Sequence, residues 1–298
     1  MLARTPPAVG EPLGSGLGGL AYRLGWRSQV VEDHLTQAFP EKPKEWVTET
    51  ARSTFRHVGR EWLSVPYISR RGLEEVRRRV VEFEGRDVLR AAYEEGRGVV
   101  IVSGHFGNWD LAGSALAAFG YPVDAVMQGM RNDLVTPLVQ KYRQGLGMGL
   151  IDRARPWARF NESLDAGRLV AFVADQDARR EGVFVPWFGR LASTHRVPAL
   201  LALRTGVPFL VGGAHRIGPR EYHGWLVRLD HPEGRDIKER VLELTRRWVE
   251  ELERRVRLYP DQYFWHHKRW KTSPPGTDPV SIGSTEETSD LPPPSVAG

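Results

Sequence analysis

Residues 98–110 read GVVIVSGHFGNWD, a continuous run of β-branched residues that ends in a glycine-flanked histidine. Such a run indicates a strand buried on both faces, as in a parallel sheet covered by helices. Similar runs occupy 169–173 (LVAFV) and 207–211 (VPFLV). Helices are expected between and after these strands, at 108–119, 134–144, 157–166 and 197–205. The alternation predicts an α/β fold with a mostly parallel central sheet flanked by helices.

Differences in amino-acid composition along the chain predict its domain organisation. The N-terminus is rich in Pro and Gly, the next segment has helical periodicity, and the C-terminus is rich in Pro, Ser and Thr. The expected organisation is a flexible N-terminus at 1–16, a single domain at 17–273 and a disordered tail at 274–298. Within the domain, 17–95 is expected to be mainly helical and 96–273 to form the α/β core, with a long charged helix at 237–258.

The segment from residue 17 to residue 26 has an apolar stripe. Leu17, Leu20 and Leu24 recur at helical spacing, and Trp26 and Arg23 lie beside them. Such a helix fits either the surface of a membrane or ordinary packing against the core. The chain has no apolar run of roughly 18 residues, so we expect no transmembrane helix and, at a membrane, peripheral binding.

The charge balance is basic, with 42 Lys and Arg against 37 Asp and Glu. A basic surface favours an anionic partner, which leaves open a phospholipid surface, a phosphorylated substrate or nucleic acid. The chain has no Cys, which excludes disulfides, thiolate metal sites and a Cys nucleophile.

His105 follows the first predicted strand, at the edge of the sheet where α/β proteins bind ligands. Asp110 falls in the first or second turn of the next helix, from which a carboxylate can reach one imidazole nitrogen and fix its tautomer. The other nitrogen is then able to take a proton from a hydroxyl. The residues alone leave two readings open, a catalytic pair and a structural one.

Several segments resemble the lipid A biosynthesis acyltransferases (lauroyl and myristoyl transferases) and relatives such as phosphatidylinositol mannoside acyltransferases. His105 and Asp110 match the H-x4-D/E motif of glycerolipid-type acyltransferases. The other matching segments, in chain order, are 30–40, 131–143, 174–177, 182–194 and 262–272. The resemblance covers roughly 17–275 and departs in two places. Many lipid A enzymes have Glu where Asp110 stands, and many begin with a hydrophobic anchor.

The resemblance implies transfer of a fatty acyl chain from acyl carrier protein or acyl-coenzyme A to a hydroxyl of a membrane glycolipid, such as a lipid A precursor. The expected place is the cytoplasmic face of the bacterial inner membrane, as a peripheral protein. His105 would deprotonate the hydroxyl for direct attack, with no acyl-enzyme, no cofactor and no metal. Backbone N–H groups of Gly107 and Asn108 are expected to face the oxyanion.

Basic residues gather between 131 and 159. Arg143 and Arg131 match arginines of the family and are expected to bind phosphates of donor or acceptor, because a guanidinium fork suits phosphate. Asp175 and Asp177 follow the second predicted strand, where they would position substrate or hold arginines such as Arg143 in place.

Three other functions compete. A metal-dependent hydrolase would use His105, Asp110, Asp175 and Asp177 as ligands, although no known metal motif is present. A nucleic-acid-binding protein would explain the charge but not the motif, so we expect no nucleic acid partner. An inactive adaptor would have no need of an intact His105 and Asp110. The pair His266-His267 is interpreted as a surface feature.

Overall fold

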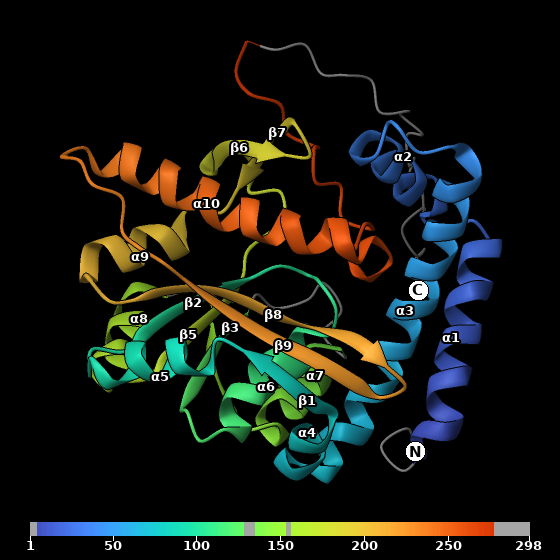
Figure 1. Ribbon diagram of the computed structural model, residues 1–298, viewed down its shortest axis with the longest axis horizontal. Helices are drawn as coiled ribbons and strands as arrows, with labels where there is room; N and C mark the ends of the chain where they lie inside the picture. Colours follow the sequence, from blue (N-terminus) through green and yellow to red (C-terminus); the bar gives the residue numbers. More distant parts are fainter. Residues whose placement is uncertain (1–4, 128–134, 153–155, 277–298) are drawn as a thin grey trace, which may run out of the picture.

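The computed structural model describes residues 5–127, 135–152 and 156–276, with a seven-stranded sheet at its centre (Figure 1). The strand order is β1-β9-β8-β2-β5-β3-β4, and every neighbouring pair is parallel except β8 with β9. The strands are β1 (Val80–Glu84), β2 (Val99–Ser103), β3 (Val123–Met127), β4 (Met148–Asp152), β5 (Leu169–Val173), β8 (Phe209–Gly218) and β9 (Glu221–Leu229). The predicted α/β class with a mostly parallel sheet is confirmed.

Strand β2 lies in the middle of the sheet, which explains its continuous apolar run. Val99 and Ile101 pack in one hydrophobic cluster, and Val100 and Val102 pack in another on the opposite face. The first cluster includes helices α4 (Leu73–Arg79), α5 (Arg86–Glu94) and α6 (Trp109–Ala118). The second includes α8 (Pro156–Asp165), α9 (Val197–Thr205) and α10 (Ile237–Leu258).

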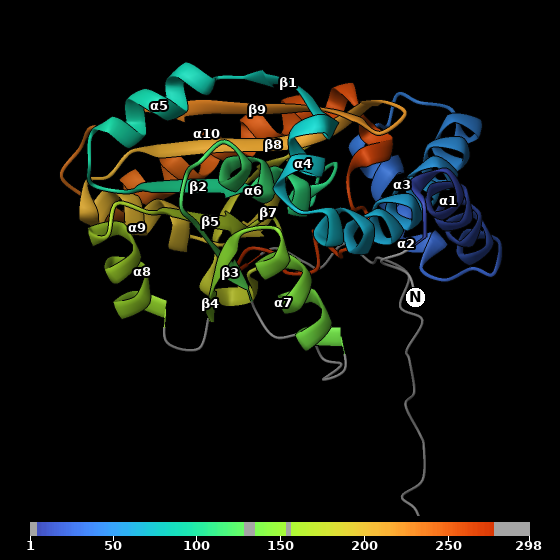
Figure 2. The same cartoon turned by 90° about the horizontal axis from the view of Figure 1, so that it is seen from below.

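Three N-terminal helices stand at one end of the sheet, where Figures 1 and 2 both show them side by side. They are α1 (Pro7–Arg23), α2 (Ser28–Ala38) and α3 (Lys44–Arg71). Helix α7 (Val135–Gly145) contacts both α3 and β4. The remaining elements are a hairpin of β6 (Val183–Trp187) and β7 (Arg190–Thr194) and two short 3-10 helices, η2 (Arg179–Glu181) and η3 (Pro260–Gln262).

Several expected boundaries differ from the structure. The strand expected at 207–211 begins at Phe209 and continues to Gly218, because it pairs with β9 over most of its length. Strands β1, β3, β4 and β9 and the hairpin were not predicted. The strand β1 reads VVEFE and is largely exposed, so it lacks the apolar signal of a central strand. Of the predicted tail, 277–298 lie outside the described residues.

The flexible segment expected at 1–16 is wrong from Pro7 onward, because α1 begins there. The buried residues of α1 are three glycines, Gly10, Gly14 and Gly18. A Cβ atom on Gly14 would lie 2.4 Å from the carbonyl oxygen of Gly59 in α3. Glycine weakens an isolated helix, but here it lets two backbones touch, and that contact supports the helix.

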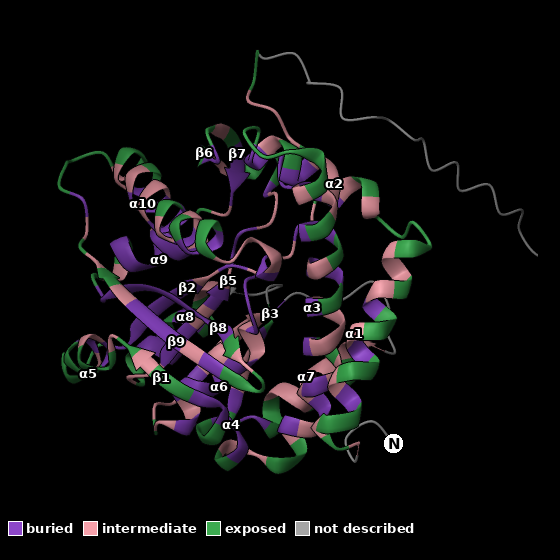
Figure 3. Ribbon diagram, turned by 45° about the vertical axis from the view of Figure 1, so that its right-hand side comes forward, coloured by how far each residue is buried: buried purple, intermediate pink, exposed green. Residues whose placement is uncertain are grey.

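A row of large apolar side chains on α1 is exposed to solvent. Val9, Leu13, Leu17 and Leu20, together with the C-cap residue Leu24, are all about half exposed or more. Figure 3 shows this contrast between the exposed residues of α1 and the buried ones of α3. Among the described helices, none has both the length and the apolar character needed to span a bilayer.

Adding one methyl group to α1 is expected to have opposite effects at two glycines. Gly18→Ala should lower the melting temperature, since its Cβ would lie 2.0 Å from the carbonyl oxygen of Phe55. Overpacking of this kind costs about 1–3 kcal/mol. Gly16 has nothing within 4 Å, so Gly16→Ala should be neutral or stabilise by up to about 1 kcal/mol. Equal melting temperatures for the two variants in thermal unfolding would contradict the packing argument.

Candidate active site

The loop between β2 and α6 carries His105 and is held from both sides. The backbone of Phe106 bridges to Tyr263, and that of Gly107 bridges to Ala214 in β8. Gly107 has φ +60°, and a Cβ there would lie 2.0 Å from the carbonyl oxygen of Ala214. Only glycine fits this position, so its role is to let the loop lie against β8.

The carboxylate that binds His105 belongs to Asp175. The His105 imidazole Nδ1 lies 2.6 Å from Asp175 Oδ1, and the His105 backbone N–H donates to Asp175 Oδ2 at 2.9 Å. Strand register explains the pair. Ser103 of β2 lies beside Val173 of β5, and each residue of the pair comes two positions after its strand. Parallel strands of equal length thus deliver both side chains to the same edge of the sheet.

Asp175 is charged although it is buried. Its side chain is 2% exposed, and burial by itself would raise its pKa. The adjacent His105 imidazole outweighs burial, with help from His267, and holds the pKa of Asp175 well below its usual range. Burial together with the Asp175 carboxylate raises the pKa of Tyr263 well above its usual value, so that hydroxyl stays protonated.

The expected contact between His105 and Asp110 is wrong. Asp110 is in the first turn of α6, and its Oδ1 accepts a hydrogen bond of 2.6 Å from Nε of Arg143 in α7. Asp175 occupies His105 Nδ1, so Asp110 instead anchors an arginine at the same pocket. The structural alternative for Arg143, a pair with Asp175 or Asp177, is also wrong.

Gly107 and Asn108 do not offer free backbone donors, contrary to the expectation for an oxyanion site. The Gly107 N–H donates to the carbonyl of Gln262, and the Asn108 N–H donates to that of Ala214, both at 2.9 Å. The Asn108 side chain caps α6 by accepting from the N–H of Leu111. Both residues therefore position the loop and the helix.

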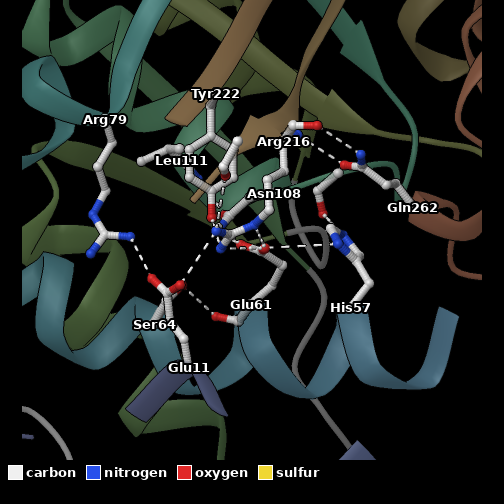
Figure 4. Close-up of polar contacts among 12 residues, drawn as sticks. Glu11, His57, Glu61, Ser64, Arg79, Asn108, Leu111, Arg216, Tyr222 and Gln262 are labelled. Carbon is white, nitrogen blue, oxygen red and sulfur yellow. Dashed lines mark hydrogen bonds and ion pairs between the residues drawn. The ribbon is translucent and has the colours of Figure 1, made fainter. Parts of the chain in front are cut away.

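Glu61 of α3 is the centre of a buried polar network behind this loop (Figure 4). Its carboxylate accepts hydrogen bonds from three side chains, Asn108 Nδ2 at 2.8 Å, Arg216 Nε at 2.8 Å and the Tyr222 hydroxyl at 2.6 Å. Burial opposes the charge of Glu61, but His57 and Arg216 outweigh it and lower the pKa of Glu61. These partners lie up to 161 positions away in the sequence, and nothing in the spacing predicted them.

The same network extends to α1. Glu11 of α1 lies 3.1 Å from Arg79 Nη1 and 3.4 Å from Arg216 Nη1. Arg79 and Arg216 are buried, and the ion pairs that Glu11 forms with both arginines link α1 to the protein interior. The N-terminal helix is therefore connected by polar contacts to the residue that holds Asn108.

His266 and His267 are not surface residues. His266 is 2% exposed, and burial lowers its pKa to about 3. Burial also lowers the pKa of His267 to about 3, with a further contribution from His105. His267 Nε2 lies 2.8 Å from Gln176 Nε2, which in turn lies 3.3 Å from His105 Nε2. Neither Gln176 nor His267 was predicted as a site residue, although Gln176 lies in the segment 174–177 that carries the family resemblance.

A pocket of about 460 Å³ has His105 in its lining. The lining also includes Gln176, Asp110 and Arg143, and many of its other residues are apolar. Three large side chains in this lining are exposed to solvent, Trp26, Trp62 and Leu138. The volume lies in the range of small-molecule sites, which are apolar with a few convergent polar groups.

Asp177 does not join this site, because its Oδ2 accepts a hydrogen bond from the Thr272 hydroxyl at 2.9 Å. The predicted residue Arg131 lies outside the described residues. The four ligands of the metal alternative do not converge, since Asp110 pairs with Arg143 and Asp177 with Thr272. Within 5–127, 135–152 and 156–276, no group of three or more His, Asp or Glu is placed to hold a metal ion.

Comparison with known proteins finds acyltransferases of two kinds. A lipid A lauroyltransferase of Escherichia coli is 27% identical over 288 residues, which cover 93% of this chain and 90% of that protein. The phosphatidylinositol mannoside acyltransferase of Mycolicibacterium smegmatis is 27% identical over 188 residues, and that of Mycobacterium tuberculosis is 32% identical over 159. These alignments cover 62% and 51% of this chain, but only 60% and 50% of the two mycobacterial proteins.

The family model described as bacterial lipid A biosynthesis acyltransferase matches residues 1–272, which include every described element of the sheet and the pocket lined by His105. The chain belongs to the bacterial lipid A biosynthesis acyltransferase family.

Proposed function

We propose that this protein transfers a fatty acyl chain from an acyl thioester to a hydroxyl group of a membrane glycolipid, with His105 as general base. The observation that carries the proposal is the 2.6 Å contact between His105 Nδ1 and the buried carboxylate of Asp175. His105 lines the pocket, and its Nε2 is 3.3 Å from Gln176, another lining residue. Asp175 takes the role first expected of Asp110. It keeps the proton on Nδ1 and stabilises the imidazolium that forms during the reaction.

The reaction is a direct displacement. His105 Nε2 takes the proton of the acceptor hydroxyl while the hydroxyl oxygen attacks the thioester carbonyl carbon. The tetrahedral oxyanion collapses, the C–S bond breaks, and the departing thiolate receives the proton from His105. The products are an ester and a free thiol, and no acyl-enzyme is needed in a chain without Cys.

The donor is an acyl carrier protein or coenzyme A thioester, both of which carry phosphate. Arg143 is a suitable phosphate ligand because Asp110 fixes its Nε and leaves its terminal N–H groups for a ligand in the pocket. The names of the relatives suggest two acceptors, a lipid A precursor and a phosphatidylinositol mannoside. A lipid A precursor is the first choice, because the alignment with the lauroyltransferase spans 90% of that protein.

Peripheral binding at the cytoplasmic face of the bacterial inner membrane completes the proposal. The exposed apolar residues of α1 lie next to Arg23 and Arg27, which suit anionic headgroups. Trp26 follows the same helix and also lines the pocket, as does the exposed Trp62. The pocket that contains His105 therefore borders the proposed membrane surface, and a lipid substrate bound there lies close to the proposed base.

Removing the base should abolish most acyl transfer. We expect His105→Ala to lower kcat by roughly 10²–10⁴ and Asp175→Asn to be severely impaired, because Asn no longer fixes the tautomer. The exposed Asp165 provides a matched control, and Asp165→Asn should behave as wild type. The assay is transfer from lauroyl thioesters to either glycolipid, with melting temperatures to verify folding. Wild-type kcat in folded His105→Ala would refute the assignment.

Arg143 provides a separate test of phosphate binding. Arg143→Ala should lower kcat/KM roughly 10- to 100-fold, the loss expected for a hydrogen bond to a charged group, mainly through KM. Arg143→Lys should retain part of the activity, since Lys keeps the charge but loses the fork. Asp110→Asn should act through Arg143 and add little to Arg143→Ala in a double-mutant cycle. Arg159→Ala, an exposed change in the same basic region, is the control. Losses that simply follow a lowered melting temperature would contradict phosphate binding.

Vesicle flotation tests the membrane surface. The protein should bind anionic vesicles at low salt, and added salt should weaken binding because it screens exposed charges. Replacing both Leu13 and Leu20 with Glu should weaken binding at least about tenfold, since each buried Leu contributes about 1.5–3 kcal/mol. Leu242 is similarly exposed on α10, so Leu242→Glu should leave binding unchanged. Equal binding by the double variant and the control would refute the role of α1.

A further inference from the structure

The side-chain amide of Gln176 lies between two imidazoles in the lining of the pocket. Its Nε2 is 2.8 Å from His267 Nε2 and 3.3 Å from His105 Nε2. An amide nitrogen has two N–H groups, so one can donate to each ring. Gln176 directly follows Asp175, which places a donor beside the nitrogen that Asp175 leaves unoccupied on His105.

The backbone donors of the catalytic loop are all in use. The N–H of His105 donates to Asp175, and that of Phe106 donates to the carbonyl of Gly104 at 2.8 Å. The N–H groups of Gly107 and Asn108 donate to other backbone carbonyls. The loop from His105 to Asn108 therefore has no backbone N–H left for the negative charge that develops on the thioester oxygen.

His267 gives the Gln176 amide a fixed orientation. Burial keeps its imidazole neutral at physiological pH, so its Nε2 is able to accept the shorter hydrogen bond. The ring of His267 is packed at 4.8 Å from that of His105 and at 4.7 Å from Phe264. A donor held in this way needs little reorganisation when charge develops nearby, which is the requirement for oxyanion stabilisation.

We propose that Gln176 Nε2–H is the oxyanion donor of the transfer reaction, a role that rests on the proposed function. Before substrate binds, this N–H faces His105 Nε2. When the acceptor hydroxyl binds at Nε2, the N–H that faced His105 donates to the thioester oxygen beside that hydroxyl, while the other N–H stays on His267. As the hydroxyl oxygen bonds to the carbonyl carbon, the π electron pair moves to that oxygen and Gln176 hydrogen-bonds it. The electron pair returns when the thiolate leaves, and the hydrogen bond weakens.

The test compares three substitutions. Gln176→Met preserves the length of the side chain but has no donor, so it should lower kcat roughly 10²–10³-fold with little change in KM. Gln176→His, which retains an N–H donor, should recover part of the loss. Gln144→Met, at an exposed position of α7, should match wild type. A kcat within threefold of wild type for folded Gln176→Met would overturn the proposal.

Two inhibitors separate oxyanion binding from a structural role. A long-chain alkyl phosphonate carries a tetrahedral anion like the intermediate, and its Kd should rise roughly 10²-fold in Gln176→Met. The thioether analogue of lauroyl-coenzyme A has no carbonyl oxygen, and its Kd should not change. If both affinities fall together, Gln176 shapes the pocket and the proposal is wrong. If the wild-type protein transfers no acyl group from any thioester, the proposed function is wrong, and this outcome is independent of the comparison between Gln176→Met and wild type.

Discussion

The buried carboxylate of Glu61 holds two strands of the sheet and the start of α6 together. It binds Arg216 of β8, Tyr222 of β9 and the N-cap residue of α6, Asn108. The loop of His105 leads directly into that cap. Removing one member of a buried ion pair leaves a charge without a partner, at a cost of about 3–5 kcal/mol. The position of the His105 loop therefore depends on a buried network of charges.

The sequence predicted the central part of the fold and missed its edges. The strand at 169–173 and the helices at 197–205 and 237–258 have the predicted limits, because these segments are buried runs or long amphipathic helices. The edge strand β1 alternates charged and apolar residues and is mostly exposed. The glycines of α1 indicated a flexible segment, since the neighbouring backbone of α3 that makes them useful is distant in sequence.

The place of His105 in the fold was predicted, but the carboxylate that contacts it was not. His105 was correctly placed after a strand, but its partner was sought five positions further along the chain. The neighbouring strand β5 instead brings the carboxylate of Asp175, 70 positions away in the sequence, into contact with His105. Asp175 and His105 each stand two residues after a predicted strand, and that shared offset was the available signal. No comparable pattern marked Gln176, whose amide contacts the imidazoles of His105 and His267.

The backbone contact between α1 and α3 has a consequence for how such a protein can change. The buried residues of α1 are glycines, whereas its leucines are about half exposed. Substitutions of these leucines are therefore expected to cost folding little. If the row binds a membrane as proposed, attachment and folding stability are nearly independent traits. Evolution or protein engineering can then change membrane attachment over a wide range while the free energy of unfolding stays nearly constant.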